Sequence, residues 1–336
     1  MTKAYFRPIV QTDAHRTAQA LRLAGGWCWF DRVERLSRDA GSEIIPVQDL
    51  PDDVLQDLTA PRPPMAGLDF SRPRLMGIVN VTPDSFSDGG RFLAPDAAAA
   101  HAEGMAQSGA DILDVGGEST RPGAETVPHD EEIRRVVPVI QAIKASVDTP
   151  VSVDTRKTQV ADAALTAGAD LLNDVSAFSH DPSMAQLVSE SGAPVCLMHA
   201  QGTPDIMQNA PTYANVLLDI YDFLEEKRDM AEAAGIPRSR IMLDPGIGFG
   251  KTLAHNLALL RRISLFHGLG CAVLLGVSRK RFIGTLGNAP QADQRAAGSI
   301  ALGLGAVMQG VQVLRVHDIE DTRQALNLAM AVTDNK

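Results

Sequence analysis

The stretch Gly109-Ala-Asp-Ile-Leu-Asp114 is repeated as Gly168-Ala-Asp-Leu-Leu-Asn173 and, in the same shape, as Gly310-Val-Gln-Val-Leu-Arg315. A looser copy begins at Gly192. Each copy follows a segment whose apolar residues are spaced as on one face of a helix. Glycine often ends a helix because it adopts a left-handed conformation without strain, and the short apolar run that follows is typical of a buried strand. The repeat therefore predicts a helix, a glycine stop and a strand with a polar residue at its end.

Other short apolar runs have the same character and raise the number of predicted strands to eight: Leu75–Val81, Pro150–Val153, Val195–Met198, Ile241–Leu243 and Ala272–Val277. Strands that alternate with helices form a parallel sheet. Eight such units match an α/β fold closed into a (β/α)8 TIM barrel, and an open doubly wound sheet is the alternative. The helical patterns between the strands are Ala98–Gln107, Glu131–Ala145, Val160–Thr166, Pro182–Glu190, Ala214–Ala234, Leu253–Phe266, Ala292–Met308 and Thr322–Val332.

Residues 1–65 lie outside this repeat and are predicted to form a small N-terminal α/β extension, with residues 66–336 forming the barrel. The extension holds both tryptophans, Trp27 and Trp29, which we expect to pack on the barrel rather than bind a ligand. Ile44–Val47 indicates a strand and Asp52–Leu58 a short helix. The role of the extension does not follow from its sequence.

Charge and composition exclude several classes of function. The chain has 31 Lys and Arg against 41 Asp and Glu, a net charge of −10, and only 4% aromatic residues. A nucleic acid is therefore a poor partner. Three scattered cysteines provide no disulfide framework or metal pair, Met1–Ala20 has no apolar core of a signal peptide, and no run is long enough to cross a membrane. We expect a cytoplasmic protein with small-molecule partners.

Polar residues at the strand ends indicate an active site, because barrel enzymes build theirs at the carboxyl ends of the strands. Hydrogen-bond acceptors follow four of the strands, and they suit a flat nitrogen heterocycle with several N–H donors, such as a 2-amino-4-oxopyrimidine ring. These acceptors are Asp114, Asp154, Asn173 and Asp244.

Cationic residues form a second set at the same predicted face, and they suit a phosphate or diphosphate and a carboxylate. Asn80 could supply an oxygen to a hard cation that bridges diphosphate oxygens. The cationic residues are Arg121, Lys280, Arg315, His317 and, as a further candidate, Lys251.

Some patterns that suggest other chemistry do not hold. Gly246-Ile-Gly-Phe-Gly-Lys251 is similar to a phosphate-binding loop, but its spacing fits neither the Walker motif nor a dinucleotide fingerprint. The histidines show no paired zinc-binding spacing, and no nucleophile elbow is present. His199 is equally consistent with a wall residue and a catalytic one.

The motifs at these strand ends closely resemble those of the dihydropteroate synthase family. Gly77-Ile-Val-Asn-Val-Thr-Pro-Asp-Ser-Phe-Ser-Asp-Gly89 and Asp114-Val-Gly-Gly-Glu-Ser-Thr-Arg-Pro-Gly123 are similar to its two signature loops. Leu243–Lys251, Ser278-Arg-Lys280 and Leu314-Arg-Val-His317 are similar to its later motifs. The resemblance implies a transferase of folate biosynthesis. It would join 6-hydroxymethyl-7,8-dihydropterin diphosphate to 4-aminobenzoate, giving 7,8-dihydropteroate and diphosphate.

The resemblance also implies residue roles. Asp114, Asp154, Asn173, Asp244 and Lys280 match the pterin site, and Asn80, Arg315 and His317 match the diphosphate and Mg²⁺ site, with Asn80 as the metal ligand. Thr120, Arg121, Pro122, Phe249 and Ser278 match the 4-aminobenzoate site. The residues expected to act in catalysis are Asp114, Asp154, Lys280, Arg315 and His317.

The family further implies a homodimer and a target of sulfonamides. Arg281 departs from the pattern, because some members have a serine there that contacts the aminobenzoate carboxylate. Two other functions remain as alternatives: a pterin-dependent methyltransferase and a pterin-binding paralogue without catalytic activity. Both would be expected to lack part of the loop and diphosphate motifs present here.

Overall fold

Eight parallel strands form a closed barrel in the computed structural model, which describes residues 3–81, 94–119, 126–202 and 211–333. The last strand pairs with the first, since Val313 is in register with Arg74. This confirms the predicted (β/α)8 TIM barrel. The strands are β6 (Arg74–Asn80), β7 (Ile112–Gly116), β8 (Val151–Asp154), β9 (Leu171–Asp174), β10 (Val195–Met198), β11 (Ile241–Asp244), β12 (Ala272–Leu275) and β13 (Val313–Val316).

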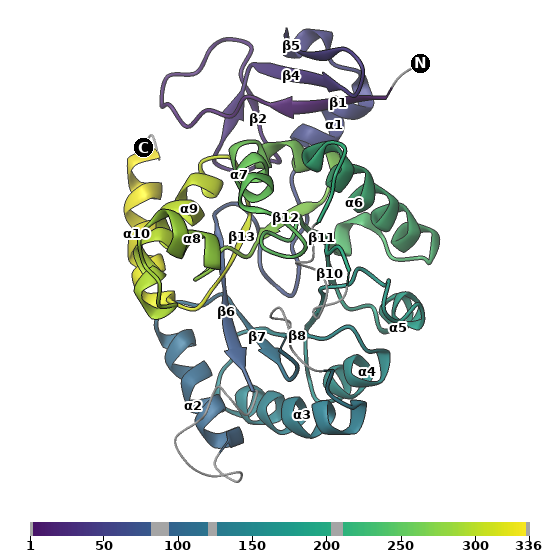
Figure 1. Cartoon of the computed structure of the whole chain (residues 1–336), viewed down its shortest axis with the longest axis vertical. Helices are drawn as coiled ribbons and strands as arrows, with labels where there is room; N and C mark the ends of the chain where they lie inside the picture. The colour runs from purple at the N-terminus through teal and green to yellow at the C-terminus, as the bar shows by residue number, and fades with distance from the viewer. Residues whose placement is uncertain (1–2, 82–93, 120–125, 203–210, 334–336) are drawn as a thin grey trace.

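Helices alternate with these strands and surround the barrel (Figure 1). The glycines of the repeat end their helices as predicted: Gly109, Gly168 and Gly310 have φ angles of 98°, 108° and 88°. The helices of the barrel are α2 (Ala94–Gln107), α3 (His129–Ser146), α4 (Thr158–Thr166), α5 (Ser183–Ser191), α6 (Val216–Ala233), α7 (Leu253–Arg261), α8 (Arg281–Leu286), α9 (Ala296–Val307) and α10 (Ile319–Thr333).

Two helical segments differ from the prediction. The pattern Leu253–Phe266 predicts one helix, but α7 ends at Arg261 and a 3₁₀ helix, η4 (Ile263–Leu269), follows. Arg262 between them has φ −132° and ψ 29°, which interrupts the α-helical hydrogen bonds. The short helix α8 was not predicted, because the run before it, Ala272–Val277, gives no sign that the strand stops at Leu275.

A turn at the start of the barrel closes its amino-terminal end. Met65 and Leu68 pair through their backbones. Met65 and Phe70 are buried in one cluster with Met76 and Ile112, which lie near the starts of their strands. Apolar side chains therefore fill this end of the barrel, and a ligand site is expected at the carboxyl ends of the strands.

The N-terminal residues form an antiparallel sheet in the order β1 (Ala4–Pro8), β4 (Arg32–Ser37) and β5 (Gly41–Pro46), together with the small pair β2 (Leu21–Arg22) and β3 (Trp29–Phe30). The 3₁₀ helix η1 (Val47–Asp49) and helix α1 (Asp52–Thr59) follow. In Figure 1 this part lies at the top, next to α6 and α7. It contacts the barrel through hydrogen bonds from Trp27 Nε1 to the Val307 carbonyl (2.9 Å) and from Ser264 Oγ to the Pro8 carbonyl (3.0 Å). Among the described residues, we find no helix with the length and hydropathy needed to span a membrane.

Candidate active site

A cluster of charges lies at the carboxyl ends of the barrel strands, and we call it the inner charge cluster: Asp114, Asp154, Asn173 and Arg315. Arg315 of β13 donates from Nε to Asp114 Oδ2 of β7 (2.6 Å) and from Nη2 to Asp154 Oδ2 of β8 (2.8 Å). Asn173 Nδ2 of β9 donates to the same Asp114 oxygen (3.1 Å). The parallel topology thus brings side chains from four strands into direct contact.

The inner charge cluster has unused acceptors. Asp114 Oδ1 and Asp154 Oδ1 are buried, and neither has a hydrogen-bond partner within the described parts of the chain. Buried polar atoms are nearly always paired in folded proteins, because an unpaired one costs about 1–3 kcal/mol. These two oxygens therefore mark where a ligand with N–H donors would bind.

The shortage of positive charge in the inner charge cluster also affects the protonation of Asp154. Burial raises the pKa of Asp154 to about 7. Arg315 opposes this rise, and the neighbouring Asp114 adds to it. Burial disfavours the charged form of Arg315, but the two carboxylates outweigh this and raise its pKa. One guanidinium shared by two buried carboxylates leaves an excess of negative charge, so the rise at Asp154 is the expected direction.

Asp244 at the end of β11 provides a further buried acceptor. Its Oδ1 accepts from the Gly246 amide (2.7 Å), and burial raises its pKa to about 6. The Lys280 ammonium acts electrostatically on Asp244 and lies 4.0 Å from the centroid of the Phe249 ring. Lys280 thus lies close to both Asp244 and Phe249.

Lys251 holds the loop that carries Phe249 through hydrogen bonds to carbonyl groups of that loop. The buried Lys251 Nζ donates to the carbonyls of Gly246 (2.8 Å) and Phe249 (2.9 Å) and contacts His199 Nδ1 (2.9 Å). A side chain at Gly246 would place its Cβ 1.9 Å from the His199 carbonyl oxygen. The interpretation of Lys251 as a cation for anions was wrong, because its ammonium is buried under the loop. His199 is likewise a wall residue, packed edge-to-face on Phe223 with ring centroids 4.7 Å apart.

The remaining predicted residues lie at neighbouring strand ends. Ser278 Oγ accepts from the His317 amide (3.1 Å) and lies 2.9 Å from His317 Nδ1. Asn80 ends β6 and is in register with Gly116 of β7. Arg281 begins α8 with its side chain exposed to solvent. Thr120, Arg121 and Pro122 lie outside the described residues.

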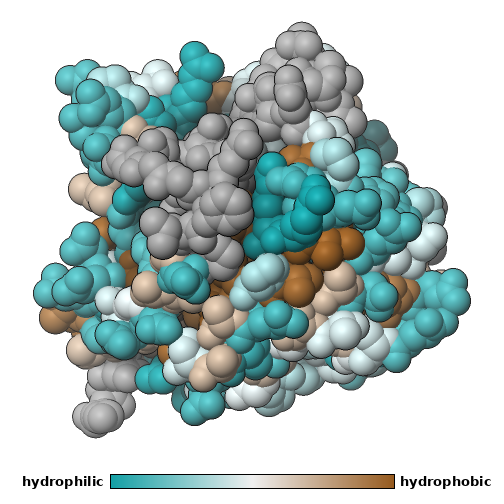
Figure 2. All heavy atoms as spheres, turned by 90° about the horizontal axis from the view of Figure 1, so that it is seen from below, coloured by the Kyte–Doolittle hydropathy of each residue, from teal (hydrophilic) through white to brown (hydrophobic). Residues whose placement is uncertain are grey.

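The face that holds these strand ends is the one toward which β6 and β7 point in Figure 1, and Figure 2 shows it from below. Strongly hydrophilic residues gather near the middle of this face and directly adjoin hydrophobic ones. Within the described chain, no group of three or more His, Cys, Asp or Glu side chains is placed to hold a metal ion by itself.

Comparisons with known proteins identify the family. A family described as pterin binding enzyme matches residues 76–317. A dihydropteroate synthase of Escherichia coli strain K12 is 45% identical over 269 residues, which is 80% of this chain and 95% of that protein. The chain belongs to the dihydropteroate synthase family.

Solved structures of dihydropteroate synthases agree. One from Xanthomonas albilineans with 4-aminobenzoic acid is 48% identical, covers 83% of this chain and 100% of that chain, and has a TM-score of 0.78. One from Yersinia pestis with a sulfonamide drug complex is 46% identical, covers 79% of this chain and 96% of that chain, and has a TM-score of 0.75. Dihydropteroate synthases are transferases of folate biosynthesis, so the predicted function is confirmed, and neither alternative function is supported by these relatives.

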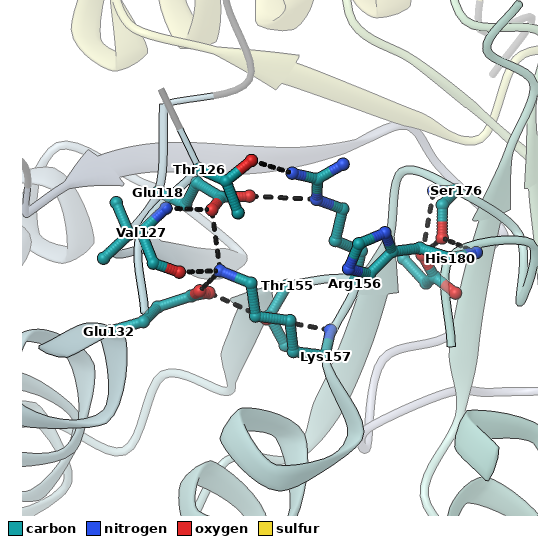
Figure 3. A network of polar contacts seen from close by, with 10 residues as sticks. Glu118, Thr126, Val127, Glu132, Thr155, Arg156, Lys157, Ser176 and His180 are labelled. Atoms are coloured by element: carbon teal, nitrogen blue, oxygen red, sulfur yellow. Dashed lines mark hydrogen bonds and ion pairs between the residues drawn. The ribbon is translucent and has the colours of Figure 1, made fainter. Parts of the chain in front are cut away.

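Sequence reasoning missed a second set of buried charges in this chain, which we call the outer charge cluster: Glu118, Glu132, Arg156 and Lys157. They come from the residues after β7, the start of α3 and the residues after β8 (Figure 3). Arg156 and Lys157 follow Asp154 closely in sequence, with Thr155 between Asp154 and Arg156. That proximity is the one available signal, but it does not reveal which carboxylates they meet.

Proposed function

We propose that this chain binds 6-hydroxymethyl-7,8-dihydropterin diphosphate on the inner charge cluster and joins it to 4-aminobenzoate. The observation that carries this assignment is a pair of buried oxygens, Asp114 Oδ1 and Asp154 Oδ1, that have no hydrogen-bond partner among the residues the structure describes. A pterin ring presents adjacent ring N–H and amino donors, which complement such acceptors. Asn173, Asp244 and Lys280 complete the ring site from the neighbouring strands.

Arg315 would act on both the pterin and the diphosphate of the first substrate. Its Nε and Nη2 are engaged by the two carboxylates, which leaves Nη1 as the end able to meet the diphosphate. His317, held by Ser278, would donate a second hydrogen bond to the leaving group. These donors stabilise negative charge as the carbon–oxygen bond breaks and its electron pair leaves with the diphosphate.

The residues present fit a magnesium ion bound together with the substrate. Mg²⁺ keeps several waters and takes few protein ligands beside substrate phosphates, so the single amide oxygen of Asn80 is a suitable donor. When bound, Mg²⁺ would neutralise diphosphate charge and favour its departure. Asn80 would hold the ion at the end of β6, beside the strand that carries Asp114.

The second substrate would bind above the pterin. Phe249 and Ser278 would line this site, and the resemblance assigns Thr120, Arg121 and Pro122 to it as well. As diphosphate leaves, positive charge develops on the exocyclic carbon, and Asp114 and Asp154 offset it. The amine nitrogen then forms the new bond to that carbon and loses a proton, so an obligatory general base is not needed. Sulfonamides that imitate 4-aminobenzoate would compete here.

We also propose that the chain acts as a cytoplasmic homodimer. The exposed apolar residues Leu328 (66% exposed) and Val332 (87%) on α10 support an interface through the last helices. We assign residues 1–65 to an N-terminal extension and 66–336 to the pterin-binding barrel.

The experiment that tests the function supplies the dihydropterin diphosphate, 4-aminobenzoate and Mg²⁺ to the full chain. Dihydropteroate and diphosphate should appear in equal amounts. A folded protein that forms neither would refute the proposal, and omission of Mg²⁺ tests the metal assignment separately.

A further inference from the structure

Two side chains from outside the loop that carries Phe249 bind the backbone of that loop. Asn256 Oδ1, on α7, accepts from the Gly248 amide (2.8 Å). The Tyr213 hydroxyl, from the segment before α6, donates to the Gly250 carbonyl (2.7 Å). Because these two glycines flank Phe249, both bonds restrain the backbone directly beside it.

These contacts matter because the sequence around Phe249 has little stiffness of its own. Glycine adopts many backbone conformations, and Gly248 and Gly250 both have positive φ angles, 87° and 61°. Phe249 donates from its amide to the Gly246 carbonyl (3.1 Å), and its own carbonyl accepts from Lys251 Nζ (2.9 Å). With both neighbouring glycines also bonded, the backbone that carries the ring has a fixed geometry.

Phe249 lies at the border between the buried interior and the surface. The residue is partly exposed, whereas Asn256 and Lys251, which support its loop, are buried. The Lys280 ammonium lies 4.0 Å from the centroid of the Phe249 ring, next to the predicted pterin site. A partly exposed ring whose backbone is held by buried polar side chains is suited to contact a ligand in one defined orientation.

We propose that Tyr213 and Asn256 are positioning residues for the second substrate and act through Phe249. They hold the ring in the orientation in which 4-aminobenzoate meets it, so that no ordering of the loop opposes binding. This rests on the proposed function, which assigns Phe249 to the 4-aminobenzoate site. The inner charge cluster lies on other strands, β7, β8, β9 and β13, so pterin binding should depend little on either residue.

The main test compares Tyr213→Phe with Tyr5→Phe. Each change removes one hydroxyl and keeps the ring, but the Tyr5 hydroxyl donates to Asp222 Oδ2 (2.9 Å) at the contact between β1 and α6. With the dihydropterin diphosphate saturating, Tyr213→Phe should raise KM for 4-aminobenzoate roughly three- to tenfold, the loss expected for one hydrogen bond. The Kd of the dihydropterin diphosphate, measured by calorimetry, should stay within about twofold, and Tyr5→Phe should change neither value.

A double variant tests whether the effect passes through Phe249. Phe249→Ala should itself raise KM for 4-aminobenzoate, and Tyr213→Phe added to it should have almost no further effect, because the ring that Tyr213 positions is gone. Full additivity of the two changes, or an equal loss for both substrates in Tyr213→Phe, would overturn the proposal.

Two variants of Asn256 test the second contact. Asn256→Leu keeps the size of the side chain but loses the acceptor for the Gly248 amide, and KM for 4-aminobenzoate should rise by about tenfold or more, because small misplacements of binding groups are costly. Asn256→Asp keeps an acceptor and should restore most of the loss. No rise in the first variant, or no recovery in the second, would refute the role of Asn256.

Amide hydrogen exchange at Gly248 tests the restraint of the loop without any assay of activity. Exchange should be faster in Asn256→Leu than in the wild type, close to the wild type in Asn256→Asp, and unchanged in Tyr5→Phe. If the wild type made no dihydropteroate, the proposed function would fail while this measurement still judged the contact. Unchanged exchange in Asn256→Leu would refute the positioning role.

Discussion

The inner and outer charge clusters both contain residues from β7 and β8 or from the residues directly after them, yet they differ in completeness. The inner charge cluster has one guanidinium for two carboxylates and leaves two buried oxygens unpartnered within the described chain. The outer charge cluster has two cations for two carboxylates, and all of the carboxylate oxygens are bonded. A buried polar network that lacks donors is prepared for a ligand, whereas a complete one holds the backbone in place.

The largest expected effect comes from Arg315→Met. It leaves Asp114 and Asp154 as buried carboxylates without their shared cation, and removal of one partner of a buried ion pair costs about 3–5 kcal/mol. Urea unfolding should show a loss of this order at pH 8, and turnover should fall by about a hundredfold or more. Arg315→Lys keeps the positive charge but loses the forked guanidinium. Its stability and turnover should therefore lie between those of the wild type and those of Arg315→Met. Unchanged stability would mean that the inner charge cluster does not depend on Arg315.

Asp244→Asn should weaken pterin binding without unfolding the barrel. Loss of a charged hydrogen bond costs about 1.5–3 kcal/mol, which corresponds to roughly a ten- to hundredfold rise in the Kd of the dihydropterin diphosphate. Stability should not fall at pH 8, because burial raises the pKa of Asp244 and disfavours its charged form. Calorimetry and thermal melting check the two statements, and an unchanged Kd would remove Asp244 from the ring site.

Acidification should weaken pterin binding while favouring the free fold. The pKa of Asp154 is raised to about 7 and that of Asp244 to about 6, from an ordinary value of 3.8. Between pH 3.8 and about 7, the folded chain therefore binds more protons at these two groups than the unfolded chain does. The stability that the two groups contribute is present at low pH and is lost as pH rises toward 7. Ring donors prefer ionised carboxylates, so binding near pH 6.5 should release protons. Calorimetry in buffers of different ionisation enthalpy measures this, and proton uptake would contradict it.

A smaller effect is expected from Arg121→Ala, because the family resemblance assigns Arg121 to the 4-aminobenzoate site and not to the pterin site. The variant should have a lower kcat/KM for 4-aminobenzoate. The Kd of the dihydropterin diphosphate should change little, because Asp154, Asp244 and Lys280 remain. Steady-state kinetics and calorimetry measure the two values, and equal losses in both would move Arg121 into the pterin or diphosphate site.

Much of the barrel could be predicted because its signals are local. Val195–Met198 matches β10 at both ends, and the glycine stops locate the helix ends. The inner charge cluster could also be predicted as a neighbourhood, because parallel strands bring Asp114, Asp154 and Arg315 to one face whatever their exact packing. Its pairing could not, since nothing local shows that one arginine spans the barrel to two carboxylates.

The failures have a common physical cause. Whether Lys251 extends into solvent or turns under its loop depends on carbonyls that only the folded loop presents. The contact of Lys157 with Glu132 depends on where α3 begins relative to β8, which is a long-range property. The pairing of β1 with β4 likewise joins distant segments, Ala4–Pro8 and Arg32–Ser37.

The glycine-rich loop after β11 limits how this enzyme can evolve. Gly246 and Gly250 have positive φ angles of 67° and 61°, and a Cβ at Gly250 would lie 2.7 Å from atoms of Gln201. Any other residue at either position would strain the backbone and collide with the segment after β10. A lineage under selection by inhibitors that imitate 4-aminobenzoate therefore has few routes through this loop. Adaptive substitutions should accumulate at Phe249 and at positions outside the loop, and the two glycines should stay fixed.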